Sequence, residues 1–270
     1  MMPEIWGWLA GLLLLAATIA GFLALFALSG PWKLVGLGAK AAAALALIVV
    51  LVLAQRVSWQ NQAWWTFGFQ RSAWSLALAV VIVDLVLAWR IRADAGTPFV
   101  DLAALLLVIG GTLSSQPSAP AVAYAGAGAP HTLESILIAV GVGALLVAGS
   151  AGLALGLRQL SKGRAHRLGW AGWLNLHVLL KHALALSLVT LGAGLVLGVW
   201  LSWRSAGFLT SGSAHAGWAA GAALIVAMGL LARRTGERWG RWAAGLAVLA
   251  ALVAALGILA VTDLCALPGT

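Results

Sequence analysis

Long apolar runs separated by short polar stretches make up most of the 270-residue chain. A helix needs about 20 apolar residues to cross the hydrocarbon core of a membrane. The pattern therefore predicts an all-α integral membrane protein, a bundle of about eight transmembrane helices with no soluble domain. The predicted spans are 5–29, 33–54, 72–90, 99–116, 132–157, 173–201, 214–232 and 239–262.

Composition supports the membrane assignment and excludes several kinds of site. Hydrophobic residues make up 63% of the chain and charged residues 9%, whereas a soluble domain has about 25% charged residues. Cys265 is the only cysteine, which excludes an intramolecular disulfide, a CxxC redox pair and covalent haem attachment through CxxCH. A cysteine-ligated iron–sulfur cluster within the chain is excluded too.

Lysines and arginines fall mainly on one side of the predicted bundle. Of the 16, Arg56, Arg71 and Arg204 lie on one side, Lys181 lies within a span, and the other 12 lie on the opposite side. Basic loops stay in the cytoplasm, so both termini are predicted on the outer side of a bacterial-type cytoplasmic (inner) membrane. The net charge of +9 is then a topology signal and a contact for anionic lipid, not a nucleic-acid patch.

Lys40, Asp84 and Lys181 lie well inside the predicted spans, where charge is costly and marks a candidate site. Asp84 and Lys181 have similar depths from the basic side, and Lys40 has a similar depth in the second span. We predict a buried charge cluster of Lys40, Asp84 and Lys181, in which Asp84 pairs with Lys181 or with Lys40. The alternative is that the lysines hold a haem propionate or a quinone head group.

The histidines offer candidate ligands. His177 and His182 are five residues apart on one predicted helix, about 140° around its axis, so both cannot face one ligand. His166 lies in a basic inner loop and is expected to be solvated. His131 and His215 begin two predicted helices that run in the same direction, so they can stand at one depth on the outer side. Two neutral imidazoles are suitable axial ligands for a b-type haem.

The stretch 200–218, WLSWRSAGFLTSGSAHAGW, surrounds His215 with aromatic and basic residues. Trp200, Trp203 and Trp218 can form an interfacial aromatic belt or a platform for a porphyrin. Arg204 can meet a propionate through a charged hydrogen bond, and Arg71 lies on the same predicted side. Further tryptophans on that side include Trp59, Trp64, Trp65 and Trp74. The alternative is that the two histidines are interfacial and never meet.

Residues 131–264 resemble the cytochrome c assembly protein family, the tryptophan-rich haem-handling membrane proteins of cytochrome c biogenesis and their HemX-type relatives. The features occur in the family's order. A helix that opens with His131 is followed by the basic loop RQLSKGRAHR and by a long helix whose last part contains Gly194, Gly198 and Trp200. The turn RRTGERWGRW then precedes a last apolar helix. The resemblance implies one membrane unit with an N-terminal half (1–118) and an assembly-like half (119–270). It also implies that His131 and the loop around His215 handle haem.

The sequence departs from the family in two places. The family's Trp-Asp-Pro-Lys-Glu core is absent between residues 210 and 218, where only Trp218 matches, and no histidine follows the last helix. A complete haem–cytochrome c synthetase is therefore not expected, and we predict no independent catalytic activity and no catalytic residues.

Three functions follow from these observations. The first is a protein that binds or passes haem b at the outer face. The second is a membrane anchor that holds b-type haem for a larger respiratory complex and exchanges electrons with quinone. The third is a haem-free structural subunit. Membrane lipid and other protein subunits are the expected partners.

Overall fold

The computed structural model describes residues 2–25, 31–60, 69–91, 97–113, 129–160 and 173–206, with short stretches at 221, 223, 225–227 and 245–254, and all of them are helical. The six long helices are α1 (Met2–Leu25), α2 (Pro31–Gln60), α3 (Phe69–Ile91), α4 (Thr97–Leu113), α5 (Ala129–Leu160) and α6 (Trp173–Ala206). Within these residues, four segments are long and apolar enough to cross a membrane: Ile5–Ala24, Trp32–Leu53, Leu133–Gly156 and Leu176–Leu201.

The first six predicted spans each correspond to one helix. The last two, 214–232 and 239–262, are described only in part, although Gly245–Ala254 is a shorter apolar helix. The count of eight spans and the sides of the two termini therefore stay predictions. So does the division of the chain at residues 118 and 119, which lie outside the described residues.

Proline marks the start of four of the six helices. Pro3, Pro31, Pro98 and Pro130 are each the first or second residue of their helix. Proline is accepted there because the first turn has no intrahelical partner for its backbone N–H groups, and because the fixed φ of proline suits a helix. In these four helices the proline thus fixes the residue at which the helix begins.

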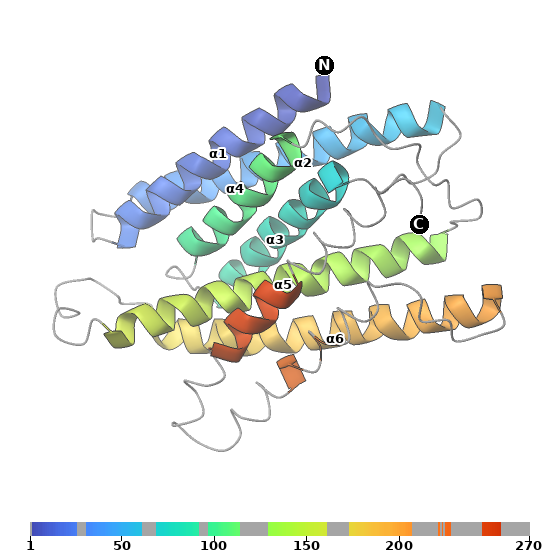
Figure 1. Cartoon of the computed structure of the whole chain (residues 1–270). Helices are drawn as coiled ribbons and strands as arrows, with labels where there is room; N and C mark the ends of the chain where they lie inside the picture. Colours follow the sequence, from blue (N-terminus) through green and yellow to red (C-terminus); the bar gives the residue numbers. More distant parts are fainter. Residues whose placement is uncertain are drawn as a thin grey trace.

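Successive helices alternate in direction (Figure 1). For example, α1 and α4 are antiparallel: a Cβ added to Gly21 would lie 3.1 Å from Pro98 Cβ, and one added to Gly7 would lie 2.9 Å from Thr112 Oγ1. We call the end where α1, α3 and α5 begin the proximal end, and the opposite end the distal end. The prediction from the basic residues makes the proximal end the outer one.

Trp74 is a core residue rather than part of the predicted outer tryptophan face. It is 1% exposed, and its Nε1 donates a hydrogen bond to Thr112 Oγ1 at 3.4 Å. Two glycines make room for the indole, since a Cβ on Gly7 or Gly111 would lie 3.2 Å or 3.1 Å from its ring. The sequence suggested an interfacial tryptophan because Trp74 is near the start of its helix, but α1 and α4 cover it.

Other tryptophans lie exposed near the helix ends. Trp6 and Trp8 are at the proximal end on α1, whereas Trp32 on α2 and Trp89 on α3 are at the distal end. Indole rings favour the interface between hydrocarbon and water. Their positions at both ends fit a bundle that crosses a membrane.

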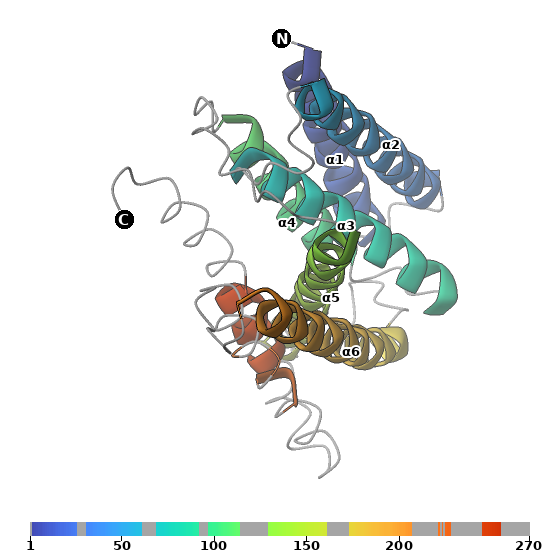
Figure 2. The same cartoon turned by 90° about the vertical axis from the view of Figure 1, so that its right-hand side faces the viewer.

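Helix α5 links the N-terminal helices to α6 (Figure 2). At Gly143 the backbones of α5 and α3 come close together, because a Cβ there would lie 3.1 Å from backbone atoms of Ala79 and Val80. Glycine lets two helix backbones come this close, as is common in membranes. On another face of α5, a Cβ on Gly149 would lie 2.9 Å from Ala251 Cβ, so the helical stretch 245–254 also packs on α5.

This close contact predicts that Gly143→Ala destabilises the protein. The added methyl meets backbone atoms that cannot rotate away, and overpacking of this kind costs about 1–3 kcal/mol. Thermal unfolding of the purified protein in detergent measures the loss.

Gly156→Ala on the same helix is the matched control, because no atom lies within 4 Å of the added Cβ. Alanine is favoured over glycine in a helix by about 1 kcal/mol, so the control should be neutral or stabilising. Equal losses in the two variants would contradict the contact.

Candidate functional site

The predicted haem-binding residues are only partly within the described chain. His131 is the third residue of α5, and Trp200, Trp203 and Arg204 lie in the last two turns of α6. His215 and Trp218 lie outside the described residues, as do Arg71's side chain and His166. The structure therefore shows how far along the bundle these helix ends lie, and it does not show how haem ligands would be arranged.

The antiparallel contact of α5 and α6 brings the two predicted segments to the proximal end. A Cβ on Gly194 would lie 3.0 Å from Ile138 Cγ1, and one on Gly198 would meet the carboxylate of Glu134. Extending this register by one turn puts His131 level with the last turns of α6. Small residues at the seam allow the close helix approach, as is usual in membranes.

The aromatic side chains at the end of α6 face away from α5. Trp200 is 44% exposed and Trp203 is 62% exposed, and the Arg204 guanidinium lies 5.4 Å from the centroid of the Trp200 ring. A cation over an indole face is attracted by the ring's quadrupole. Both indoles are thus partly exposed, and the positive charge beside them suits an anionic group.

Glu134 is a residue of this end that sequence reasoning missed. Its side chain is half-buried and occupies the space above Gly198. The available signal was one acidic residue three positions after His131, opposite the Gly194–Gly198 pair. It adds a negative charge to a site otherwise argued from histidine, tryptophan and arginine.

His177 and His182 point in different directions, as their spacing predicts. His177 is half-buried and His182 is exposed. The His182 ring donates a hydrogen bond from Nδ1 to the carbonyl of Val178, one turn earlier, at 2.8 Å. Both lie toward the distal end of α6, far from the predicted outer haem residues.

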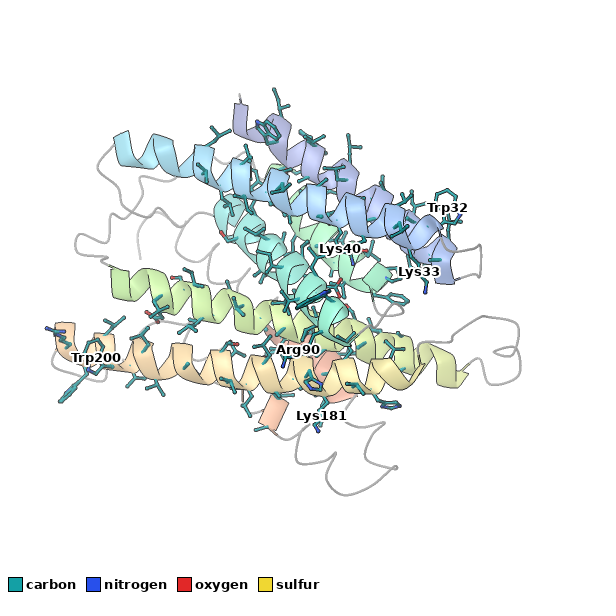
Figure 3. All side chains as sticks on the ribbon, turned by 180° about the vertical axis from the view of Figure 1, so that it is seen from behind. Trp32, Lys33, Lys40, Arg90, Lys181 and Trp200 are labelled. Carbon is teal, nitrogen blue, oxygen red and sulfur yellow. The ribbon has the colours of Figure 1, made fainter. Side chains whose placement is uncertain are left out.

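The buried charge cluster consists of Lys40, Asp84 and Asp101, one residue from each of α2, α3 and α4. Lys40 Nζ donates to Asp84 Oδ2 at 2.5 Å and lies 2.9 Å from Asp101 Oδ1. The three residues are 4%, 0% and 1% exposed. Figure 3 shows Lys40 inside the bundle, whereas Lys33 and Trp32 lie at the end of α2. Buried ions must be paired in this way, because their desolvation is costly.

Lys181 is not part of this cluster, and the predicted membership needs correction. Its side chain is exposed on α6, and Figure 3 shows it pointing away from the bundle. A residue's predicted depth does not give its direction around the helix axis. The buried face of α6 is the one that packs on α5, and Lys181 lies opposite it.

Asp101 takes the place that the prediction gave to Lys181. It is the fifth residue of α4 and therefore enters the bundle from the distal end, as Asp84 and Lys40 do. The signal was in the sequence: Asp101 begins an apolar run, at a depth comparable to that of Asp84. No set of three or more His, Cys, Asp or Glu side chains suited to a metal ion occurs in the part of the chain that the structure describes.

Comparison with known proteins does not assign the chain to a family. The sequence matches no known protein family, no curated protein and no solved structure.

The cluster predicts a non-additive response to substitution. Lys40→Met leaves two buried acidic groups without their cation, and breaking a buried pair in this way costs about 3–5 kcal/mol. Replacing Asp84 and Asp101 by Asn as well removes the two unpaired acidic groups, so the triple variant should recover most of the lost thermal stability.

Lys181→Met is the matched control, because it removes an exposed lysine at a similar depth. It should change stability little. Additive losses for Lys40, Asp84 and Asp101 would show that the three side chains do not interact.

Proposed function

We propose that the chain is a multi-pass membrane protein that binds haem b at the outer face, in the manner of the cytochrome c assembly proteins it resembles. It handles haem without catalysis of its own. Its membrane is the bacterial-type cytoplasmic membrane, with eight spans and both termini outside. Membrane lipid and other protein subunits are its partners.

The observation that carries this proposal is the arrangement at the proximal end. The first turn of α5, which contains His131, is level with the last turns of α6, which contain Trp200, Trp203 and Arg204. A porphyrin needs an apolar aromatic surface, a cation near its propionates and an imidazole near its iron. This end of the bundle supplies the first two as exposed indoles and a guanidinium, and it has a histidine at the same level.

The residues that would hold haem b are His131 and His215 as axial ligands, with Arg204 at a propionate. Trp200, Trp203 and Trp218 would cover its apolar surface. When bound, the haem would supply one-electron redox chemistry.

The second candidate is a membrane anchor that holds haem b permanently and exchanges electrons with quinone in a larger respiratory complex. It is favoured by the loss of the family's Trp-Asp core while histidines remain toward both ends of the bundle, with half-buried His177 at the distal one. The third candidate, a haem-free structural subunit, needs none of these side chains.

A reduced-minus-oxidised visible spectrum of the purified full chain distinguishes the three. A b-type α band excludes the haem-free subunit. Haem retained in stoichiometric amount through purification favours the anchor, whereas substoichiometric haem that exchanges with added haem favours the carrier. A chain that neither retains nor takes up haem contradicts the proposal.

Ligand substitution is expected to act on the spectrum. His131→Ala or His215→Ala should lower haem occupancy or convert a low-spin spectrum to high-spin, because each removes one axial imidazole. His166→Ala, in a basic loop, is the matched control and should do neither. Unchanged spectra in both ligand variants would remove this assignment and leave His177 and His182 as the next candidates.

The predicted orientation can be tested by labelling cysteines from outside. In a Cys265→Ser background, Ser118→Cys and Ser211→Cys should react with a membrane-impermeant maleimide on intact cells, because both belong to predicted outer loops. Ser161→Cys, in the predicted inner loop, should react only after the membrane is opened. The reverse pattern would invert the topology.

A further inference from the structure

The cluster of Lys40, Asp84 and Asp101 has one more acidic group than basic groups. Two carboxylates share one ammonium, so a fully ionised cluster carries one net negative charge. All three side chains are buried. An uncompensated charge in an apolar interior is strongly disfavoured, and such groups change their protonation instead.

Among the side chains that the structure describes on the packed helices, none supplies the missing positive charge. Residues 5–25 of α1 contain no ionisable side chain. Lys33 on α2 and Arg90 on α3 are exposed, and Asp101 is the only ionisable residue of α4. On the described part of α5 that packs against α3 and α4, the ionisable side chain is Glu134, which is acidic and lies at the proximal end. Lys181 on α6 is exposed.

The cluster also has unused hydrogen-bonding capacity. Asp84 Oδ1 and Asp101 Oδ1 receive no hydrogen bond from any described group, although both are shielded from solvent. Asp101 Oδ1 is within ion-pair distance of Lys40 Nζ, so Asp84 Oδ1 is the oxygen left without any partner. A buried oxygen of this kind is costly unless it carries or receives a proton.

From this geometry we infer that the cluster is a proton-binding site within the membrane, which holds one exchangeable proton on its pair of aspartates at neutral pH. The bound proton makes the cluster neutral, with one ammonium, one carboxylate and one carboxylic acid. This inference does not depend on haem binding.

The position of the cluster allows the proton to exchange at the distal end. Asp101 is the fifth residue of α4, Asp84 lies seven residues before the end of α3, and Lys40 is the tenth residue of α2. At 1.5 Å per residue, these are depths of about 6–14 Å. The proton is thus held one to three helical turns from the distal surface, where Lys33 and Arg90 are exposed.

Infrared spectroscopy of the full chain in lipid nanodiscs tests the inference, because a protonated carboxyl has its own carbonyl band. At neutral pH the native protein should show one aspartic acid band that shifts in D₂O. The band should be absent in Asp84→Asn and in Asp101→Asn, since each leaves a neutral lysine–aspartate pair. In Lys40→Met its area should be about doubled, because both carboxyls must then be neutral. Glu134→Gln is the control and should leave the band unchanged.

If a variant does not fold, the native protein can be labelled with aspartate that carries ¹³C in its side-chain carboxyl group. The label must then shift the carbonyl band of the native protein if that band comes from a protonated aspartate. The inference is overturned if no protonated aspartate is present at neutral pH or if the band does not shift in D₂O. It is also overturned if the band persists in both Asn variants. A band seen only in choline buffer and lost in sodium or potassium salts would overturn it too, by showing that a metal cation neutralises the cluster.

Discussion

The ammonium of Lys40 is where three helices of the N-terminal bundle meet. It reaches one carboxylate on α3 and another on α4 from a position ten residues into α2. Each of these groups would be unacceptable alone in an apolar interior, so α2, α3 and α4 can pack only in registers that bring all three together. A hydrophobic stripe tolerates sliding by a turn, whereas this contact does not, and it therefore fixes how the helices align.

Around that point, close packing depends on small residues rather than on large apolar ones. Lipid tails are as apolar as leucine, so burying leucine does not drive helices together in a membrane. Gly7 and Gly21 let α1 approach α4, Gly143 lets α5 approach α3, and Gly194 lets α6 approach α5. Specificity in the described bundle comes largely from the Lys40 cluster, and glycine allows the helices to come close.

The sequence allowed the helices to be predicted, because apolar runs and first-turn prolines define them in one dimension. It also allowed the depth of each ionisable residue to be predicted, since depth follows from counting residues. It did not allow us to predict the direction in which a side chain points around its helix axis. Lys40 and Lys181 have similar depths, yet one is buried between helices and the other is exposed. Trp74 shows the same limit, because only the packing of α1 and α4 decides that it is a core residue. The haem residues stay a prediction, because His215 and Trp218 lie outside the described residues.

The lengths of the helices have a consequence for the lipid around them. Helix α4 has 17 residues, or about 26 Å, whereas α6 has 34 residues, or about 51 Å. The hydrocarbon core of a membrane is about 30 Å thick, so the described length of α4 falls short of it and that of α6 exceeds it. A bilayer meets such a mismatch by thinning beside a short helix and by letting a long one tilt. Asp101 is the fifth residue of α4, so any thinning at that end would shorten the distance between the lipid head groups and the buried charges.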